Sequence, residues 1–224
     1  MDITNFSYQL PDKRQLFQDL SISFVPGQIN ILLGVNGVGK STLLDFIAGV
    51  SPNKQAAAFH DFPPMQQVAY QMQGVPVTGA TTVLQTLQMM LELDDPSLSV
   101  TAADLPATLQ PIAHTKFRHL SGGQRRLVML EGVCHLQRQL YLFDEPESGL
   151  DVKVAAQVMH QICQLPAAGK TVILTTHQFE NLPVDQTHIA LLANQRCVFS
   201  GSPQELMALN QTTSLQAAYL QADM

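Results

Sequence analysis

No other stretch of the chain narrows the choice of fold as much as residues 34–42, GVNGVGKST. They satisfy the pattern G-x-x-x-x-G-K-[ST], in which glycines let backbone N–H groups turn inward around phosphate oxygens. Lys40 can reach the β- and γ-phosphates, and the Ser41 hydroxyl is placed to bind Mg²⁺. An apolar run precedes the loop and a helical pattern, 40–48, follows it. We therefore predict that the nucleotide is bound by Gly34, Val35, Asn36, Gly37, Val38, Gly39, Lys40, Ser41 and Thr42.

Strand patterns and helical patterns alternate along the chain, which is typical of an α/β fold with a parallel sheet. Residues 20–24 alternate apolar and polar side chains, and residues 29–33 form a more continuously apolar strand. Two further apolar strands, 140–143 and 171–176, are each preceded by a helical pattern. Near the end, two apolar runs flank residues 193–195, which predicts a hairpin.

The middle of the chain has a different pattern. Over residues 83–91 apolar side chains recur at helical spacing, with Thr82 as a candidate N-cap. The sequence Asp-Asp-Pro at 94–96 predicts the end of this helix. We therefore expect residues 80–120 to form an all-helical lobe inserted into the α/β core.

Composition and charge narrow the possible partners. With 46% apolar and 13% charged residues among 224, the chain can bury a sizeable core. The formal charge of −6 argues against nucleic acid as the main partner, because phosphate contacts need a basic face. The three cysteines lack metal-ligand spacing, the N-terminus lacks a secretory-signal pattern, and no apolar run approaches about 18 residues. We expect a soluble, cytosolic chain that can still dock on a membrane protein.

Two adjacent carboxylates follow the apolar strand at 140–143. Asp144 and Glu145 lie at the C-terminal edge of that strand, where open α/β sheets place their ligands. Since successive strand side chains point to opposite sides, the two acids need not share one role. Asp144 suits the Mg²⁺ shell, and Glu145 is then available to polarise the attacking water as general base. His177 follows the strand at 171–176 and faces the same edge.

Four further motifs follow the phosphate-binding loop: LSGGQ at 120–124, YLFDEP at 141–146, SGLD at 148–151 and TTH at 175–177. With that loop, they make the chain resemble the ATP-binding-cassette (ABC) ATPases over nearly its whole length. The resemblance implies an α/β fold: a P-loop NTPase core with a mostly parallel sheet, an N-terminal antiparallel β subdomain and an inserted α-helical subdomain. It also implies one ABC ATPase domain over 1–224, whose helical lobe includes the start of the helix after LSGGQ.

The resemblance also assigns roles around the bound nucleotide. It implies that His177 touches the γ-phosphate and helps to hold the water and Glu145 in line, and that Gln73 contacts Mg²⁺ and this water. Gln71 is a nearby alternative to Gln73. Tyr8 matches the aromatic residue that stacks on adenine, with Phe6 as its alternative. The implied catalytic residues are Glu145, His177 and Gln73, and the implied metal ligands are Ser41, Gln73 and Asp144.

The LSGGQ motif opens a helix, and Ser121 can serve as its N-cap. The resemblance implies that this helix end meets the ATP held by a second ABC ATPase subunit, in a homodimer or a heterodimer. The implied signature residues, acting in trans, are Leu120, Ser121, Gly122, Gly123 and Gln124. The implied D-loop residues are Ser148, Gly149, Leu150 and Asp151.

Three residues depart from the family pattern. Glu147 stands where the family often has threonine, which adds a negative charge near the expected dimer seam. Leu127 occupies a place that is often basic, and Gln195 replaces a common turn glycine. None lies at an expected catalytic group. We therefore expect these residues to modulate activity and the geometry of the partner contact rather than ATP hydrolysis itself.

The sequence is compatible with three hypotheses of function. The first is an ATP-binding and ATP-hydrolysing subunit of an ABC transporter, which lies on the cytoplasmic face of the cell membrane and serves separate transmembrane permease subunits. The second is a soluble ABC ATPase that acts on nucleic acid or ribosomes. The third is a nucleotide-binding switch without hydrolysis. The negative charge and compact helical lobe favour the first over the second, and Glu145 and His177 speak against the third.

Overall fold

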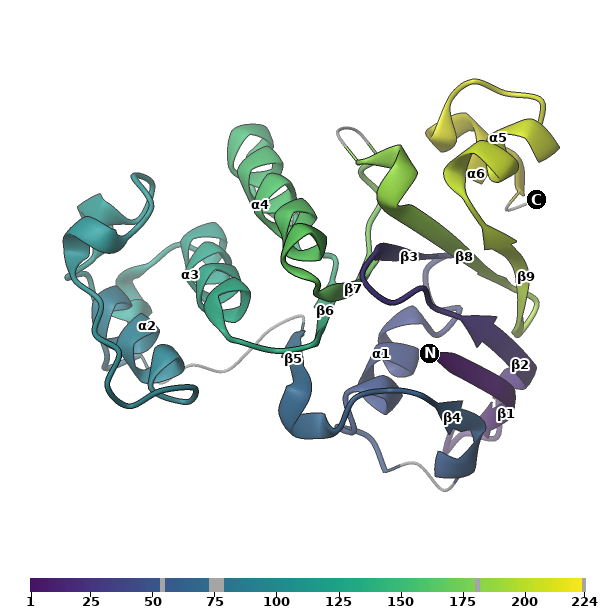
Figure 1. Cartoon of the computed structure of the whole chain (residues 1–224), viewed down its shortest axis with the longest axis horizontal. Coiled ribbons are helices and arrows are strands. Elements are labelled where there is room, and N and C mark those ends of the chain that lie inside the picture. Colours follow the sequence, from purple (N-terminus) through teal and green to yellow (C-terminus); the bar gives the residue numbers. More distant parts are fainter. Residues whose placement is uncertain (53–54, 73–78, 180–181, 223–224) are drawn as a thin grey trace.

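Six strands form the larger of two sheets in the computed structural model, which describes residues 1–52, 55–72, 79–179 and 182–222 (Figure 1). The strand order is β5-β6-β7-β3-β8-β9, and all neighbours are parallel except β8 and β9. Every residue of β3, β6 and β7 is buried, as expected for parallel strands covered on both faces. The strand bounds are β3 Ile29–Leu33, β5 Val68–Gln71, β6 Leu140–Asp144, β7 Thr171–Thr175, β8 Thr187–Ala193 and β9 Arg196–Gly201.

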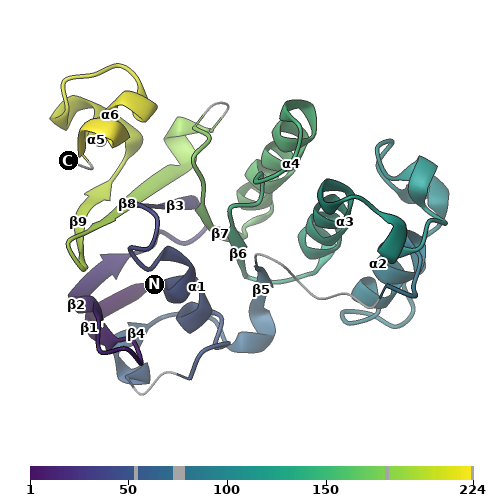
Figure 2. The same ribbon diagram turned by 180° about the vertical axis from the view of Figure 1, so that it is seen from behind.

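The smaller sheet is antiparallel and has the order β2-β1-β4, with β1 Asp2–Gln9, β2 Gln15–Ser23 and β4 Phe59–His60. Helix α1, Lys40–Ile47, lies between the two sheets (Figures 1 and 2). Its buried face shares one apolar cluster with β1 and β2 on one side and with β6, β7 and β8 on the other. The predicted α/β core with an N-terminal antiparallel sheet is confirmed.

The predicted helix after Thr82 is confirmed as α2, Val83–Leu91. The Thr82 hydroxyl accepts a hydrogen bond from the Gln85 backbone, and the Gln85 side chain completes a capping box. The helix ends at Leu91, before the predicted Asp-Asp-Pro stop. Short 3₁₀ helices continue the lobe at Ala102–Asp104, Gln110–Ile112 and Phe117–His119. Other 3₁₀ turns are Ala56–Ala58, Met65–Gln67, Leu165–Ala168 and Val184–Gln186.

Helices α3, Gly122–His135, and α4, Val152–Gln164, contribute to a second apolar cluster that also includes residues of α2 and of the larger sheet. The predicted hairpin is confirmed as β8–β9, with Asn194 and Gln195 as its two turn residues. Gln195 has a φ of 68°, a conformation that favours glycine. Helices α5, Pro203–Leu209, and α6, Leu215–Ala222, follow. None of the described helices is long and apolar enough to cross a membrane.

Candidate functional site

The predicted phosphate-binding loop joins β3 to α1. Gly39, the residue before the helix, has a φ of 111°. A Cβ there would lie 2.6 Å from Cζ of Phe17, so both the backbone and the available space require glycine. The first turn of α1, all of which the structure describes, contains no acidic residue. The partial positive charge of this helix end is therefore available to a phosphate.

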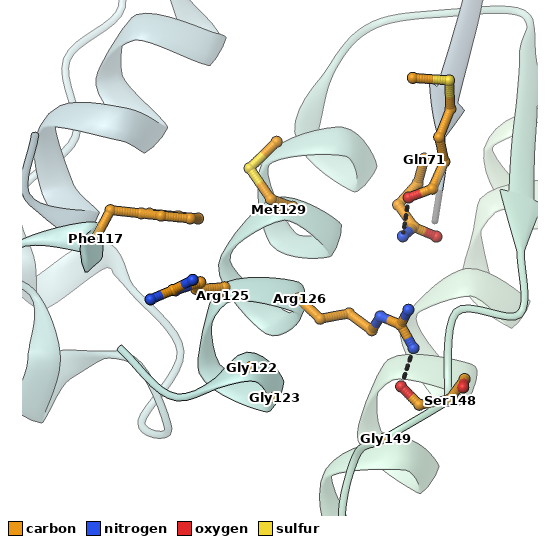
Figure 3. Close-up of a pocket in the computed structure, with 10 residues that line it drawn as sticks. Gln71, Phe117, Gly122, Gly123, Arg125, Arg126, Met129, Ser148 and Gly149 are labelled. Carbon is orange, nitrogen blue, oxygen red and sulfur yellow. Dashed lines mark hydrogen bonds between the residues drawn. The ribbon is translucent and has the colours of Figure 1, made fainter. Parts of the chain in front are cut away.

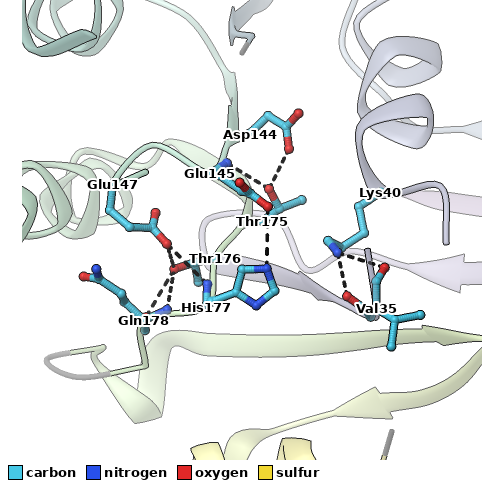
Figure 4. Close-up of polar contacts among 10 residues, drawn as sticks. Val35, Lys40, Asp144, Glu145, Glu147, Thr175, Thr176, His177 and Gln178 are labelled. Atoms are coloured by element: carbon cyan, nitrogen blue, oxygen red, sulfur yellow. Dashed lines mark hydrogen bonds and ion pairs between the residues drawn. The ribbon is translucent and has the colours of Figure 1, made fainter. Parts of the chain in front are cut away.

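Lys40 is buried at the start of α1, with only 8% of the residue exposed. Its Nζ donates to the carbonyl oxygens of Gly34, at 2.5 Å, and Val35, at 3.2 Å (Figure 4). The ammonium group thus lies inside the loop that the sequence predicts to bind phosphates. Ser41 follows Lys40 in the same helical turn and is exposed.

The two acids after β6 face different surroundings. Asp144 is buried, and its Oδ1 accepts a hydrogen bond of 2.7 Å from the Thr175 hydroxyl at the end of β7. Glu145 has left the strand with a φ of 47°, a left-handed conformation that costs energy in a non-glycine residue. This turn separates the two carboxylates. The prediction that they need not share one role therefore agrees with their geometry, but the cause is the turn rather than strand alternation.

His177 lies opposite Glu145. Its Nε2 is 3.5 Å from Oε1 of Glu145, an ion-pair distance when the ring is protonated (Figure 4). The side chains of both residues are partly exposed, which makes them accessible to water and to a ligand. Thr175, which the sequence reasoning missed, joins the two strand ends. Its hydroxyl donates to Asp144 and accepts from the Glu145 backbone N–H at 2.9 Å. The sequence signal that could have identified Thr175 is a hydroxyl residue at the end of a predicted strand, beside the strand that carries the acid pair.

A third carboxylate, Asp45 of α1, lies close enough to Asp144 to feel its charge. Burial raises the pKa of the Asp45 carboxyl, a hydrogen bond from Tyr70 lowers it, and the negative charge of Asp144 raises it further. The Tyr70 hydroxyl donates to Oδ1 of Asp45 at 3.0 Å, and burial raises the pKa of this hydroxyl above its usual range. The region around Asp144 is therefore one where additional negative charge is unfavourable and a cation is favourable.

Asp45→Asn should raise the melting temperature at pH 7 by about 1–3 °C, because asparagine keeps the Tyr70 bond without the charge. Since the folded-state pKa is raised, the contribution of Asp45 is complete below its ordinary value of 3.8 and is lost as pH rises through the folded value. The gain should therefore vanish in acid. Asp95→Asn is the control: hydrogen bonds from Ser97 lower the pKa of Asp95, so this variant should show no gain. A gain from Asp45→Asn that does not change with pH would contradict the assignment.

The predicted cap of the LSGGQ helix is present. The Ser121 hydroxyl accepts from the Gln124 backbone N–H at 3.2 Å, and the Gln124 side chain accepts from the Ser121 backbone at 2.9 Å. Gln124 thus has a structural partner within its own helix end. Ser121 and Gly122 are exposed, and Leu120 is buried. Figures 1 and 2 place α3 on the side of the molecule that carries α2, apart from α1.

The predicted D-loop lies against the start of α3. The Ser148 carbonyl oxygen accepts a hydrogen bond from the Arg126 guanidinium (Figure 3). A Cβ on Gly123 would lie 3.4 Å from the carbonyl oxygen of Gly149. A cavity of about 490 Å³ lies here, lined by Gln71, Met72, Phe117, Gly122, Gly123, Arg125, Arg126, Met129, Ser148 and Gly149. Leu150 packs against the core, and Asp151 caps α4 through its side chain.

Two predicted contacts of the nucleotide, Tyr8 and Gln73, stay predictions. The ring of Tyr8 lies edge-on to Phe46, near the end of α1, with centroids 4.8 Å apart. Across the β1–β2 pair Tyr8 lies opposite Phe17, whose ring lies beside Gly39 of the phosphate-binding loop. Gln73 lies outside the described residues. Its alternative, Gln71, is buried at the end of β5, with its Nε2 donating to the Met72 carbonyl at 3.0 Å.

The structure gives Glu147 partners that the sequence did not reveal. The residue is 6% exposed and its carboxylate points into the chain, and the expected negative charge near a dimer seam stays a prediction. Oε1 accepts hydrogen bonds from the hydroxyl of Thr176 and the backbone N–H of His177 (Figure 4). The position of Glu147 in the sequence could not show this, because its partners come from the residues that follow β7.

Comparisons with known proteins agree with this geometry. A family model described as ABC transporter matches residues 17–148, and an AAA-domain model matches 113–185. The nickel import ATP-binding protein LarO of Lactiplantibacillus plantarum is 31% identical over 202 residues, covering 80% of this chain and 83% of that protein. The molybdate import ATP-binding protein MolC of Haemophilus influenzae is 29% identical, covering 96% and 87%. The energy-coupling factor transporter ATP-binding protein EcfA of Methanosphaera stadtmanae is 25% identical, covering 92% and 80%.

Solved structures share the fold. The ATP-binding subunit of an ABC transporter superimposes with a TM-score of 0.76 and 20% identity, covering 98% of both chains. A dimeric ATP-binding cassette in a post-hydrolysis state with ADP and Pi gives 0.71 and 19%, covering 90% of this chain and 98% of that one. The chain therefore belongs to the ABC transporter family, and it is an ATP-binding subunit that hydrolyses ATP to power transport.

Proposed function

We propose that residues 1–224 act as one domain that holds ATP–Mg²⁺ at residues 34–42 and cleaves it with Glu145 as general base. The observation that carries this proposal is the meeting of three neighbouring strand ends, β3, β6 and β7 (Figure 4). They bring together a buried ammonium group, a carboxylate held by a threonine, and a second carboxylate beside a histidine. The variant Glu145→Gln, argued in the Discussion, tests the assignment of the base.

The available donors fit Mg²⁺. Asp144 and Ser41 offer a carboxylate and a hydroxyl, the hard oxygen ligands that this ion prefers. Burial is the main cause of the raised pKa of Asp45 and the negative charge of Asp144 adds to it, so a cation at Asp144 would relieve this repulsion. When bound, Mg²⁺ would neutralise charge on the β- and γ-phosphates. Gln73 remains a predicted third ligand outside the described residues.

Different residues of the chain would then carry out different parts of ATP hydrolysis. Lys40 and the N-terminus of α1 stabilise negative charge on the phosphates. Glu145 accepts the proton of the attacking water, and His177, 3.5 Å from its carboxylate, orients that water at the γ-phosphate. Tyr8, exposed to a hollow of about 540 Å³ beside Phe46, is the proposed platform for adenine.

A second copy or a related subunit would complete the site. Ser121 and Gly122 present the exposed N-terminus of α3 to solvent, and the two hydrogen bonds between Ser121 and Gln124 cap this helix end. An exposed N-terminus that ends in glycine suits a phosphate brought by another chain. The dimeric state of the solved ATP-binding cassette supports the same arrangement.

ATP hydrolysis by this chain would power separate membrane subunits. The chain would be bound to the cytoplasmic face of the cell membrane. The apolar residues 75–77, which follow Gln73 directly and which we expect to receive a membrane subunit, lie outside the described residues. Next to them in sequence, α2 carries a hollow of about 530 Å³. Its lining is mainly apolar or uncharged: Ala80, Thr81, Leu84, Gln85, Gln88, Met89, Glu92 and Val100. An apolar segment of a membrane subunit fits such a surface.

Met89→Glu should weaken retention of the chain on native membranes by about 10-fold, because it places a charge in this hollow. Met89 is 58% exposed, so folding and the ATPase activity of the isolated chain should not change. Retention is measured as the fraction of chain that sediments with membranes. Leu209→Glu makes the same change at a 70% exposed site on α5 and should have no effect. Equal loss from both variants would contradict docking at α2.

A further inference from the structure

One buried carboxylate joins the two loops that carry Glu145 and His177. Glu147 lies two residues after Glu145, and its Oε1 accepts from the hydroxyl of Thr176 at 2.5 Å and from the backbone N–H of His177 at 3.2 Å (Figure 4). The contact therefore acts on the peptide of His177 and leaves its ring available to the site.

Glu147 is rigidly connected to Glu145 as well. The Ser148 backbone N–H donates to the Glu145 carbonyl at 3.1 Å, and the Leu150 backbone N–H donates to the Glu147 carbonyl at 3.1 Å. The first of these hydrogen bonds closes a tight turn that contains both Glu145 and Glu147, and this turn restricts the spacing between them. A movement of the Glu147 carboxylate would therefore change the 3.5 Å distance between Glu145 and His177.

Folding alone does not account for this carboxylate. Oε2 of Glu147 is buried and has no hydrogen-bond partner among the residues that the structure describes. A buried polar atom without a partner destabilises a fold. The family pattern often has threonine here, which is shorter and uncharged and could not span the same gap. A group that is retained in this chain at a cost to folding points to a role in the site.

We propose that Glu147 is a positioning residue that holds His177 at its working distance from Glu145. It would do so by accepting from the His177 backbone and from Thr176. The inference rests on the proposed function, because it gives Glu147 a role only if His177 acts at the γ-phosphate.

Glu147→Leu removes the acceptor. We expect kcat for ATP hydrolysis to fall about 10-fold, with KM for ATP within about twofold of the parent, because His177 shifts while the phosphate-binding loop stays intact. Glu147→Gln keeps an acceptor oxygen of the same reach and should restore most of kcat. Glu147→Thr, the residue common in the family, should lose as much as leucine, and it serves as the second variant if the leucine variant does not fold.

A matched control distinguishes an effect on the position of His177 from an effect on the stability of the fold. Glu131 of α3 is also a buried acid, 5% exposed, with Oε1 3.4 Å from Nδ1 of His135. Glu131→Leu removes a buried carboxylate away from the site, so it can change the melting temperature but should leave kcat unchanged. If its kcat falls as far as that of Glu147→Leu, the loss reflects general destabilisation and the proposal is overturned.

A double-mutant cycle gives the decisive comparison, read from single-turnover rates. If Glu147 acts through His177, adding Glu147→Leu to His177→Ala should change the rate by less than about twofold. Losses that multiply, or a parental kcat in Glu147→Leu, would overturn the positioning role and leave the proposed function standing. A parental rate in His177→Ala would instead overturn the role of His177 in the proposed function, and this inference with it.

Discussion

Glu145→Gln is expected to lower ATP turnover by at least about 100-fold while ATP binding is retained. The amide has nearly the shape of the carboxylate, so the turn at a φ of 47° and the bonds from its backbone to Thr175 should persist. What is lost is the base that accepts a proton from water. Because ATP stays uncleaved, two subunits should remain joined around it. The measurements are phosphate release, nucleotide binding, and the dimer fraction in size-exclusion chromatography with ATP.

The control is Glu92→Gln, which changes an exposed acid on the helical lobe in the same way. It should hydrolyse ATP at the parental rate and elute as the parent does. Near-parental turnover by Glu145→Gln would show that another group is the base. A loss of nucleotide binding would show instead that Glu145 acts in binding.

The phosphate-binding loop and the helix end at Ser121 could be predicted because their chemistry is local. Glycines, a lysine and a helix start within nine residues define the first, and the Ser121 cap needs only its own next turn. The strands at 29–33 and 140–143 could be predicted equally well, since each is a mainly apolar run, interrupted only by Asn30, that is buried on both faces.

Contacts between strands could not be predicted in the same way. Thr175 joins Asp144 to Glu145 only because β7 lies beside β6, and Glu147 turns inward because residues after β7 offer it two donors. The left-handed conformation of Glu145 is also set by the surrounding structure, since local preference disfavours it. Tyr8 was placed by motif alone, and packing set its ring against Phe46.

The second large effect concerns the site shared between subunits. Lys40→Ala and Ser121→Arg should each lower ATPase activity by at least about 100-fold when present in both subunits. Alanine removes the ammonium group from the phosphate-binding loop, and arginine fills the exposed helix end where the partner's phosphate would lie. Ser121 is exposed, so the fold should accept arginine there. Melting curves of both variants check this.

Mixing these two inactive variants tests the composite site most directly. Each mixed dimer places both changes in one site and leaves the other intact, so an equal mixture should regain about one quarter of parental activity if one site works alone. The assay is run at high chain concentration with ATP, which favours association. Recovery of activity that rises with chain concentration is the predicted result. ATPase activity of Ser121→Arg alone that does not depend on chain concentration, or no recovery on mixing two folded variants that dimerise, would contradict the account.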